Sequence, residues 1–116
     1  MSYAYVGCRT TKERNARGKG LKVFEINDKT GDWNLIQCLK TEEENPSYQA
    51  LDNEGNFLYS VHGDKTKVYV IKRNEDGSLD EIVSETHLPG KKEGTVSFAH
   101  QCIWDQTKTF LFVVTQ

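Results

Sequence analysis

The sequence lacks the residues on which small secreted scaffolds and zinc modules depend. Its three cysteines, Cys8, Cys38 and Cys102, are far apart and have no C-x-x-C spacing, which excludes a disulfide framework and a thiolate zinc site. We expect all three to be buried thiols that act as small hydrophobic side chains. Proline is also scarce, with 2 in 116 residues, and together with 36% apolar residues this excludes collagen-like and disordered chains.

Long apolar runs and an excess of one charge are missing too. The longest apolar run, Phe110–Val114, is far shorter than the roughly 20 residues that cross a bilayer, so no membrane span is expected. The N-terminus has neither the basic start nor the apolar stretch of a signal peptide, which favours the cytoplasm. Lys and Arg number 15 against 17 Asp and Glu, and a net charge of −2 gives no general attraction to nucleic acid or anionic lipid.

Short runs that alternate apolar and polar residues are present throughout, and Gly, Asn and Asp separate them. This is the signature of strands and turns, and it predicts an all-β protein. The predicted strands are Ala4–Cys8, Leu21–Asn27, Trp33–Leu39, Tyr48–Asp52, Phe57–His62, Lys67–Lys72, Leu79–Glu85, Ala99–Asp105 and Phe110–Thr115.

The strand pattern repeats along the chain. Asp52-x4-Phe-Leu-Tyr-x-Val returns 53 positions later as Asp105-x4-Phe-Leu-Phe-x-Val. Lys22-Val-Phe-x-Ile returns 45 positions later as Lys67-Val-Tyr-x-Ile. A repeat of about 40 to 50 residues with four short antiparallel strands is typical of a β-propeller blade.

The strands of a propeller blade are labelled A to D outward from the central channel. With these labels the chain divides into three parts. Residues 42–89 form a complete blade, residues 1–41 supply strands B to D of the blade before it, and residues 90–116 supply strands A and B of the next. About two and a quarter blades cannot close a ring, because propellers typically have 4 to 8. We therefore expect the N-terminal part of a longer protein, whose remaining blades would cover otherwise unpaired strand edges.

Several motifs, taken together and in order, resemble a known family. They are Tyr5–Gly7, Gly18–Phe24, Glu44–Tyr48, Asn53–Tyr59, and His100-Gln101 followed by Asp105 and Phe110–Val113. The series is similar to the lactonase family of seven-bladed propellers, which includes bacterial 6-phosphogluconolactonases and fungal carboxymuconate-lactonising enzymes. The resemblance spans essentially the whole chain but only about the first third of a family member.

The chain departs from the family pattern at two positions. Members often carry Pro-His-Pro-His-Gln at the inner strand of the third blade, where this chain has Ser-Phe-Ala-His-Gln, with Phe98 in place of the first His. Thr115 stands where an Asp commonly follows the next strand. These departures bear on the substrate and on whether the chain is catalytic.

A small-molecule site in a propeller is expected where the loops entering the A strands and joining B to C open around the channel. Four segments meet that condition: Cys8–Lys19, Glu43–Tyr48, His62–Lys65 and Gly94–Gln101.

His100 is the candidate catalytic residue, because imidazole can exchange a proton near neutral pH when a lactone ring opens. A structural histidine bonded to neighbouring backbone is an equally good interpretation. Gln101 is a candidate for orienting substrate through its amide, although such a residue often pairs locally.

Three further residues are candidates for binding substrate. Tyr48 begins an inner strand, where its phenol could line the channel or fill space between blades. His62 precedes Gly63-Asp64 at a strand end, an arrangement that an ordinary polar turn explains better. Arg17 lies with Lys12, Arg14 and Lys19 on one long loop; such cations could bind a phosphate, although charged loops are most often solvated.

The resemblance implies an enzyme that hydrolyses a sugar lactone, 6-phosphogluconolactone foremost, without metal or cofactor. We expect the 116-residue chain itself to be inactive. A muconate-type lactonising cycloisomerase and a non-catalytic propeller that binds a ligand or protein remain as alternatives.

Overall fold

A computed structural model describes residues 1–116, and it is all-β. The nine strands are β1 (Ser2–Gly7), β2 (Leu21–Ile26), β3 (Trp33–Leu39), β4 (Pro46–Leu51), β5 (Phe57–His62), β6 (Lys67–Arg73), β7 (Leu79–His87), β8 (Ala99–Trp104) and β9 (Leu111–Thr115). The one helical element is a 3-10 turn at Lys12–Arg14. No helix is long and apolar enough to cross a membrane.

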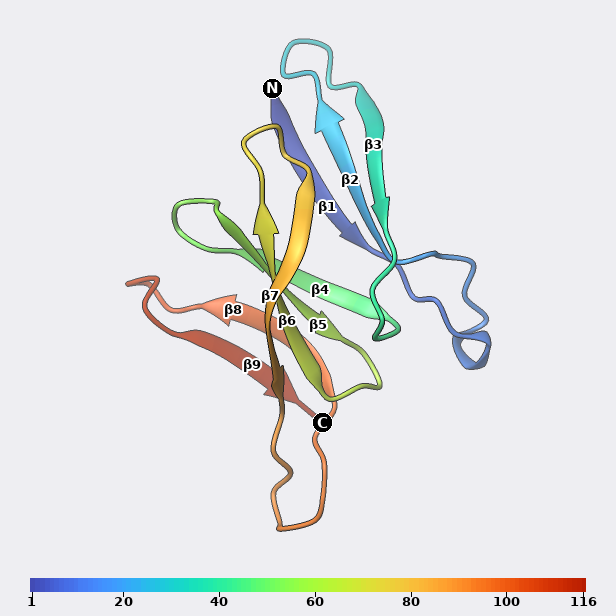
Figure 1. Ribbon diagram of the computed structural model, residues 1–116, viewed down its shortest axis with the longest axis vertical. Helices are drawn as coiled ribbons and strands as arrows, with labels where there is room; N and C mark the ends of the chain where they lie inside the picture. Colours follow the sequence, from blue (N-terminus) through green and yellow to red (C-terminus); the bar gives the residue numbers. More distant parts are fainter.

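The strands form three separate antiparallel sheets, β1-β2-β3, β4-β5-β6-β7 and β8-β9. Figure 1 shows them as successive layers along the chain, with the four-stranded sheet between the other two. Sequential antiparallel sheets stacked face to face are the arrangement of propeller blades. The predicted fold class, an incomplete β-propeller, is therefore confirmed.

The strands start and end within a few residues of the predicted positions. The largest differences are at β1 and β4, which begin two residues earlier than expected, and at β7, which runs two residues further, to His87. At β4 the reason is a bulge: Pro46 pairs with His62, and the register shifts before Tyr48 pairs with Val61.

The two central strands of the middle sheet, β5 and β6, pack against neighbouring sheets on both faces. Leu58, Tyr69 and Ile71 pack against Leu21 and Val23 of the first sheet. On the opposite face, Val61 and Val68 pack against Ala99 and Cys102 of the third sheet. Because side chains alternate between the faces of a strand, β5 and β6 supply apolar residues to both neighbours at once.

The two outer sheets each leave an apolar face uncovered. On the first sheet Trp33 and Leu35 are 56% and 49% exposed. On the third sheet Ile103 and Phe112 pair across the strands and are 55% and 58% exposed. Exposed apolar faces of this kind occur where a protein binds another protein, a ligand or a membrane.

The repeated Asp of the sequence has a structural role in the turn after each inner strand. The side chain of Asp52 accepts hydrogen bonds from the N–H groups of Asn56 and Phe57. Asp105 accepts the equivalent bonds from Thr109 and Phe110. The D-x4-F spacing therefore fixes a turn that joins two strands of one sheet.

The prediction of three buried thiols is wrong for two of them. Only Cys102 is buried, whereas Cys8 is half-buried and Cys38 is exposed. Cys38 pairs with Lys22, on the face of the first sheet that points away from Leu21 and Val23.

Candidate functional site

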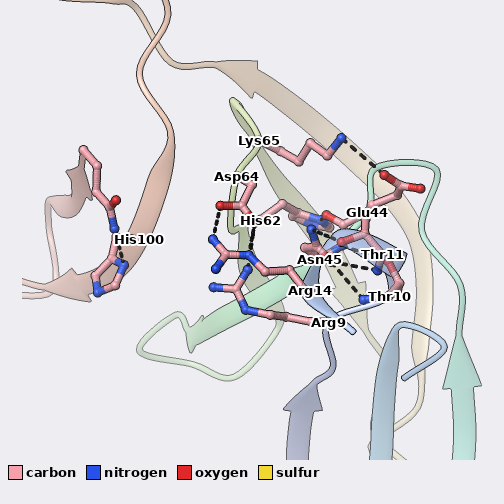
Figure 2. Close-up of polar contacts among 11 residues, drawn as sticks. Arg9, Thr10, Thr11, Arg14, Glu44, Asn45, His62, Asp64, Lys65 and His100 are labelled. Atoms are coloured by element: carbon pink, nitrogen blue, oxygen red, sulfur yellow. Dashed lines mark hydrogen bonds and ion pairs between the residues drawn. The ribbon is translucent and has the colours of Figure 1, made fainter. Parts of the chain in front are cut away.

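Four loops come together at one end of the three sheets. They are residues 8–20, 40–45, 63–66 and 88–98, which join β1 to β2, β3 to β4, β5 to β6 and β7 to β8. The Nζ of Lys65 pairs with Glu44 at 3.2 Å, and the N–H of Ala99 donates to the carbonyl of Lys65 at 3.0 Å. The ion pair joins the 40–45 and 63–66 loops (Figure 2), and the backbone bond joins the 63–66 loop to the third sheet.

Asn45 anchors the long 8–20 loop to the middle sheet. It is 1% exposed and has a left-handed backbone with φ of 56°. Its Oδ1 accepts hydrogen bonds from the N–H groups of Thr10 at 2.9 Å and Thr11 at 3.2 Å, and its carbonyl accepts one from Gly63 at 2.9 Å. Asparagine suits this position because its short amide tolerates the left-handed region while it bonds nearby backbone.

Two arginines on the anchored loop share one carboxylate. Arg14 makes a two-point contact with Asp64, through Nε at 2.6 Å and through Nη2, and Arg9 Nη1 lies 3.1 Å from the same group. The hydrogen bond from Arg14 is the main reason that the pKa of Asp64 is lowered. Asp64 is therefore ionised, and the cluster carries one net positive charge.

His100 lies across a hollow from these arginines. The hollow is about 280 Å³ and is lined by Arg9, Arg14, Gly63, Asp64, Phe98, Ala99, His100 and Gln116. The ring of His100 is exposed, and its Nδ1 lies 2.9 Å from the amide nitrogen of Gln116. This contact orients the ring, while Nε2 has no protein partner (Figure 2).

Residues 10–115 match the model of a family described as lactonase, seven-bladed β-propeller. The chain belongs to this lactonase family. Its fold is similar to that of the periplasmic gluconolactonase of Pseudomonas aeruginosa, with a TM-score of 0.75 and 18% identity over 97% of this chain. At that identity the likeness shows a shared fold.

A second solved structure, a candidate 6-phosphogluconolactonase from Bacteroides fragilis, matches 97% of the chain at 17% identity with a TM-score of 0.49. The lactonase chain spans 32% of the Pseudomonas protein and 45% of the Bacteroides protein. No curated protein sequence matches it.

Tyr48 and Gln101 of this lactonase chain lie together, away from the hollow. The amide of Gln101 donates to the Tyr48 hydroxyl at 3.3 Å, which joins the inner strands β4 and β8. Tyr48 is 41% exposed, so its ring is only partly enclosed between the two sheets that this bond joins. Both residues lie on inner strands, Tyr48 on β4 and Gln101 on β8, and their roles in binding substrate stay predictions.

His62 is not placed to bind substrate. Its side chain is fully buried, packs edge-on against Tyr69 with ring centroids 5.1 Å apart, and places Nδ1 2.8 Å from the Glu44 carbonyl. Burial lowers the pKa of His62, so the ring is neutral and donates from Nδ1. The expected polar turn is present, because the N–H of Lys65 donates to the His62 carbonyl at 3.1 Å and Asp64 has a left-handed backbone. The ring of His62 itself is buried and bonds the 40–45 loop.

Arg17 is exposed and does not line the hollow. Of the four cations singled out on this loop only Arg14 reaches the hollow, and it is accompanied by Arg9, which charge clustering did not single out. The sequence signal for Arg9 is its place two residues after the end of β1, at the start of the loop that carries the other cations.

A larger groove of about 740 Å³ lies between the 8–20 and 40–45 loops, and its lining includes Lys19, Lys40 and Glu42 to Glu44. It contains none of the residues that face His100. No cluster of three or more His, Cys, Asp or Glu side chains is arranged to hold a metal ion.

Proposed function

We propose that this chain is part of a longer seven-bladed propeller that hydrolyses a sugar lactone in the hollow beside His100. The single observation that carries the proposal is the convergence of His100, Arg9, Arg14 and Asp64 from separate sheets of a lactonase-family chain. The likeness to a structure named gluconolactonase agrees with this substrate class. Among such lactones, 6-phosphogluconolactone is our first candidate.

The three sheets supply strands B to D, A to D, and A and B of successive blades in this proposal, with boundaries near residues 42 and 90. Further blades would cover the exposed apolar faces that include Trp33 and Phe112. They would also complete the wall of the channel. We therefore expect the 116-residue chain alone to be inactive.

His100 acts as the proton carrier. The imidazole accepts a proton from water as the water oxygen attacks the lactone carbonyl carbon, and then returns it to the ring oxygen when the ring C–O bond breaks. The product is the open hydroxy acid, so atoms and charge balance without a redox partner. Phe98 and Ala99 give this side of the hollow an apolar surface against which the sugar ring can pack.

The test measures loss of 6-phosphogluconolactone and glucono-δ-lactone above their spontaneous rates, using the complete protein. Replacing His100 with alanine should lower kcat by about 10²- to 10⁴-fold, the usual contribution of a general acid–base group. His87→Ala is the matched control, because His87 is exposed at the end of β7 and lines no part of the hollow. Unchanged turnover in His100→Ala would refute the role of His100, and no turnover by the complete protein would favour a non-catalytic or lactonising propeller. Turnover by the 116-residue chain would contradict the need for further blades.

A further inference from the structure

The arginine pair has more hydrogen-bonding capacity than Asp64 uses. Arg14 directs Nε and Nη2 at the carboxylate, and Arg9 directs Nη1. The remaining N–H groups of both guanidiniums have no protein partner. Guanidinium groups match the geometry of phosphate and carboxylate oxygens, so these free donors are suited to an anion.

The local charge also favours an anion. Arg9 and Arg14 are opposed only by Asp64 among the residues that line the hollow. Glu13 and Glu44 face a neighbouring hollow on the other side of Arg14, and Glu44 is paired with Lys65. The excess positive charge therefore faces the side on which His100 lies.

The backbone is built to hold this pair in place. Asp64 has a left-handed conformation with φ of 66°, which directs its carboxylate toward the 8–20 loop. Gly63 lies so close to Arg9 that an added Cβ would be 2.9 Å from Nη1 and 3.0 Å from Nη2. The guanidinium of Arg9 thus lies against bare backbone, and any side chain at position 63 would displace it.

We infer that Arg9 and Arg14 together bind an anionic group of the substrate, a phosphate or a carboxylate, while the lactone carbonyl lies near His100. The inference rests on the proposed function and assigns the residues that would select an acidic lactone over a neutral one. Asp64 orients the two guanidiniums and is a positioning residue.

The experiment compares three lactones with the complete protein: 6-phosphogluconolactone, which carries a phosphate, muconolactone, which carries a carboxylate, and neutral glucono-δ-lactone. Arg9→Gln and Arg14→Gln should each lower kcat/KM for the acidic lactone that is the substrate by roughly 10- to 100-fold, because each removes charge-assisted hydrogen bonds. The value for glucono-δ-lactone should change less than about threefold. Comparison of the two acidic substrates identifies the anion.

Two further variants separate the effect of the position of the Arg9 guanidinium from the effect of the charge on the loop. Gly63→Ala keeps every charge but displaces Arg9, so it should raise KM for the acidic lactone and leave kcat nearly unchanged. Lys12→Gln is the matched control, because it removes one exposed cation from the same loop without touching the hollow. Equal losses for acidic and neutral lactones in Arg9→Gln and Arg14→Gln, or an equal loss in Lys12→Gln, would overturn the inference.

Calorimetric titration with inorganic phosphate gives a readout that does not depend on turnover. We expect the complete protein and Lys12→Gln to bind phosphate, and Arg9→Gln and Arg14→Gln to bind it at least 10-fold more weakly. If no lactone is hydrolysed but this pattern appears, the proposed function fails and the anion site stands. If phosphate binding is the same in all variants, the anion site is refuted even where lactones are hydrolysed.

Discussion

Replacing Asn45 with alanine should lower the free energy of unfolding by about 3 kcal/mol, because one buried side chain satisfies two backbone donors and tolerates a left-handed backbone. The two hydrogen bonds to Thr10 and Thr11 contribute roughly 1 kcal/mol each, since both threonines are half-buried and water only partly replaces the amide. Alanine at a φ of 56° adds about 1 kcal/mol of strain.

Asn45→Gly separates the two contributions. Glycine adopts positive φ without strain but loses the same hydrogen bonds, so it should cost about 2 kcal/mol and be more stable than the alanine variant. Both variants should also speed amide exchange at Thr10 and Thr11 and raise KM, because the 8–20 loop that carries Arg9 and Arg14 is released.

Urea unfolding followed by tryptophan fluorescence measures the stabilities, and hydrogen exchange reports the two amides. The reasoning would be refuted if the alanine variant unfolded within about 0.5 kcal/mol of the parent protein, or if the glycine variant were the less stable of the two. Exchange that stayed slow at both threonines would show that another group holds the loop.

Three other outcomes follow from single residues. Burial lowers the pKa of His62, so below about pH 6.5 the unfolded chain binds more protons than the folded protein, and the free energy of unfolding should fall as the pH drops. Urea titrations at pH 7 and pH 5 should show a smaller loss of unfolding free energy in His62→Gln than in the parent protein. Hydrogen bonds from Thr107 and from the N–H groups of the turn lower the pKa of Asp105 to about 2, a value that NMR titration should reproduce. The ionised carboxylate stabilises the folded protein above about pH 4, and this stabilisation is lost as the pH falls toward 2. Lys108 has a φ of 59° and occupies the position that Gly55 holds in the preceding copy of the repeat. Lys108→Gly should therefore raise the free energy of unfolding by up to about 1 kcal/mol in urea titrations. A decrease would contradict the argument that Lys108 is strained.

The all-β fold could be predicted from the sequence because its determinants are local. Alternation with a period of two identifies each strand, and the repeated Asp-x4-Phe spacing corresponds to two turns closed by the same side-chain bonds, at Asp52 and Asp105. The meeting of the four loops on one face also followed, because antiparallel strands of similar length return their alternate connections to the same end.

The composition of the site could not be predicted in the same way. His62 precedes a Gly-Asp pair and has the sequence context of an exposed turn, yet the packing of Tyr69 and the 40–45 loop buries it. Arg17 and Arg14 are equivalent as members of a charged loop, and only the 3-10 turn and the carboxylate of Asp64 direct Arg14 into the hollow.

The sequence by itself determined the strands, the turns and the order of the sheets, since these depend on residues a few positions apart. Only the tertiary structure decided that Arg9, Arg14 and Asp64 share one hollow with His100, because the loop of the two arginines, Asp64 and His100 lie 36 to 91 positions apart in the chain. The physical reason is that burial and charge pairing depend on which surfaces come into contact, and that is set by how whole sheets stack rather than by any one segment.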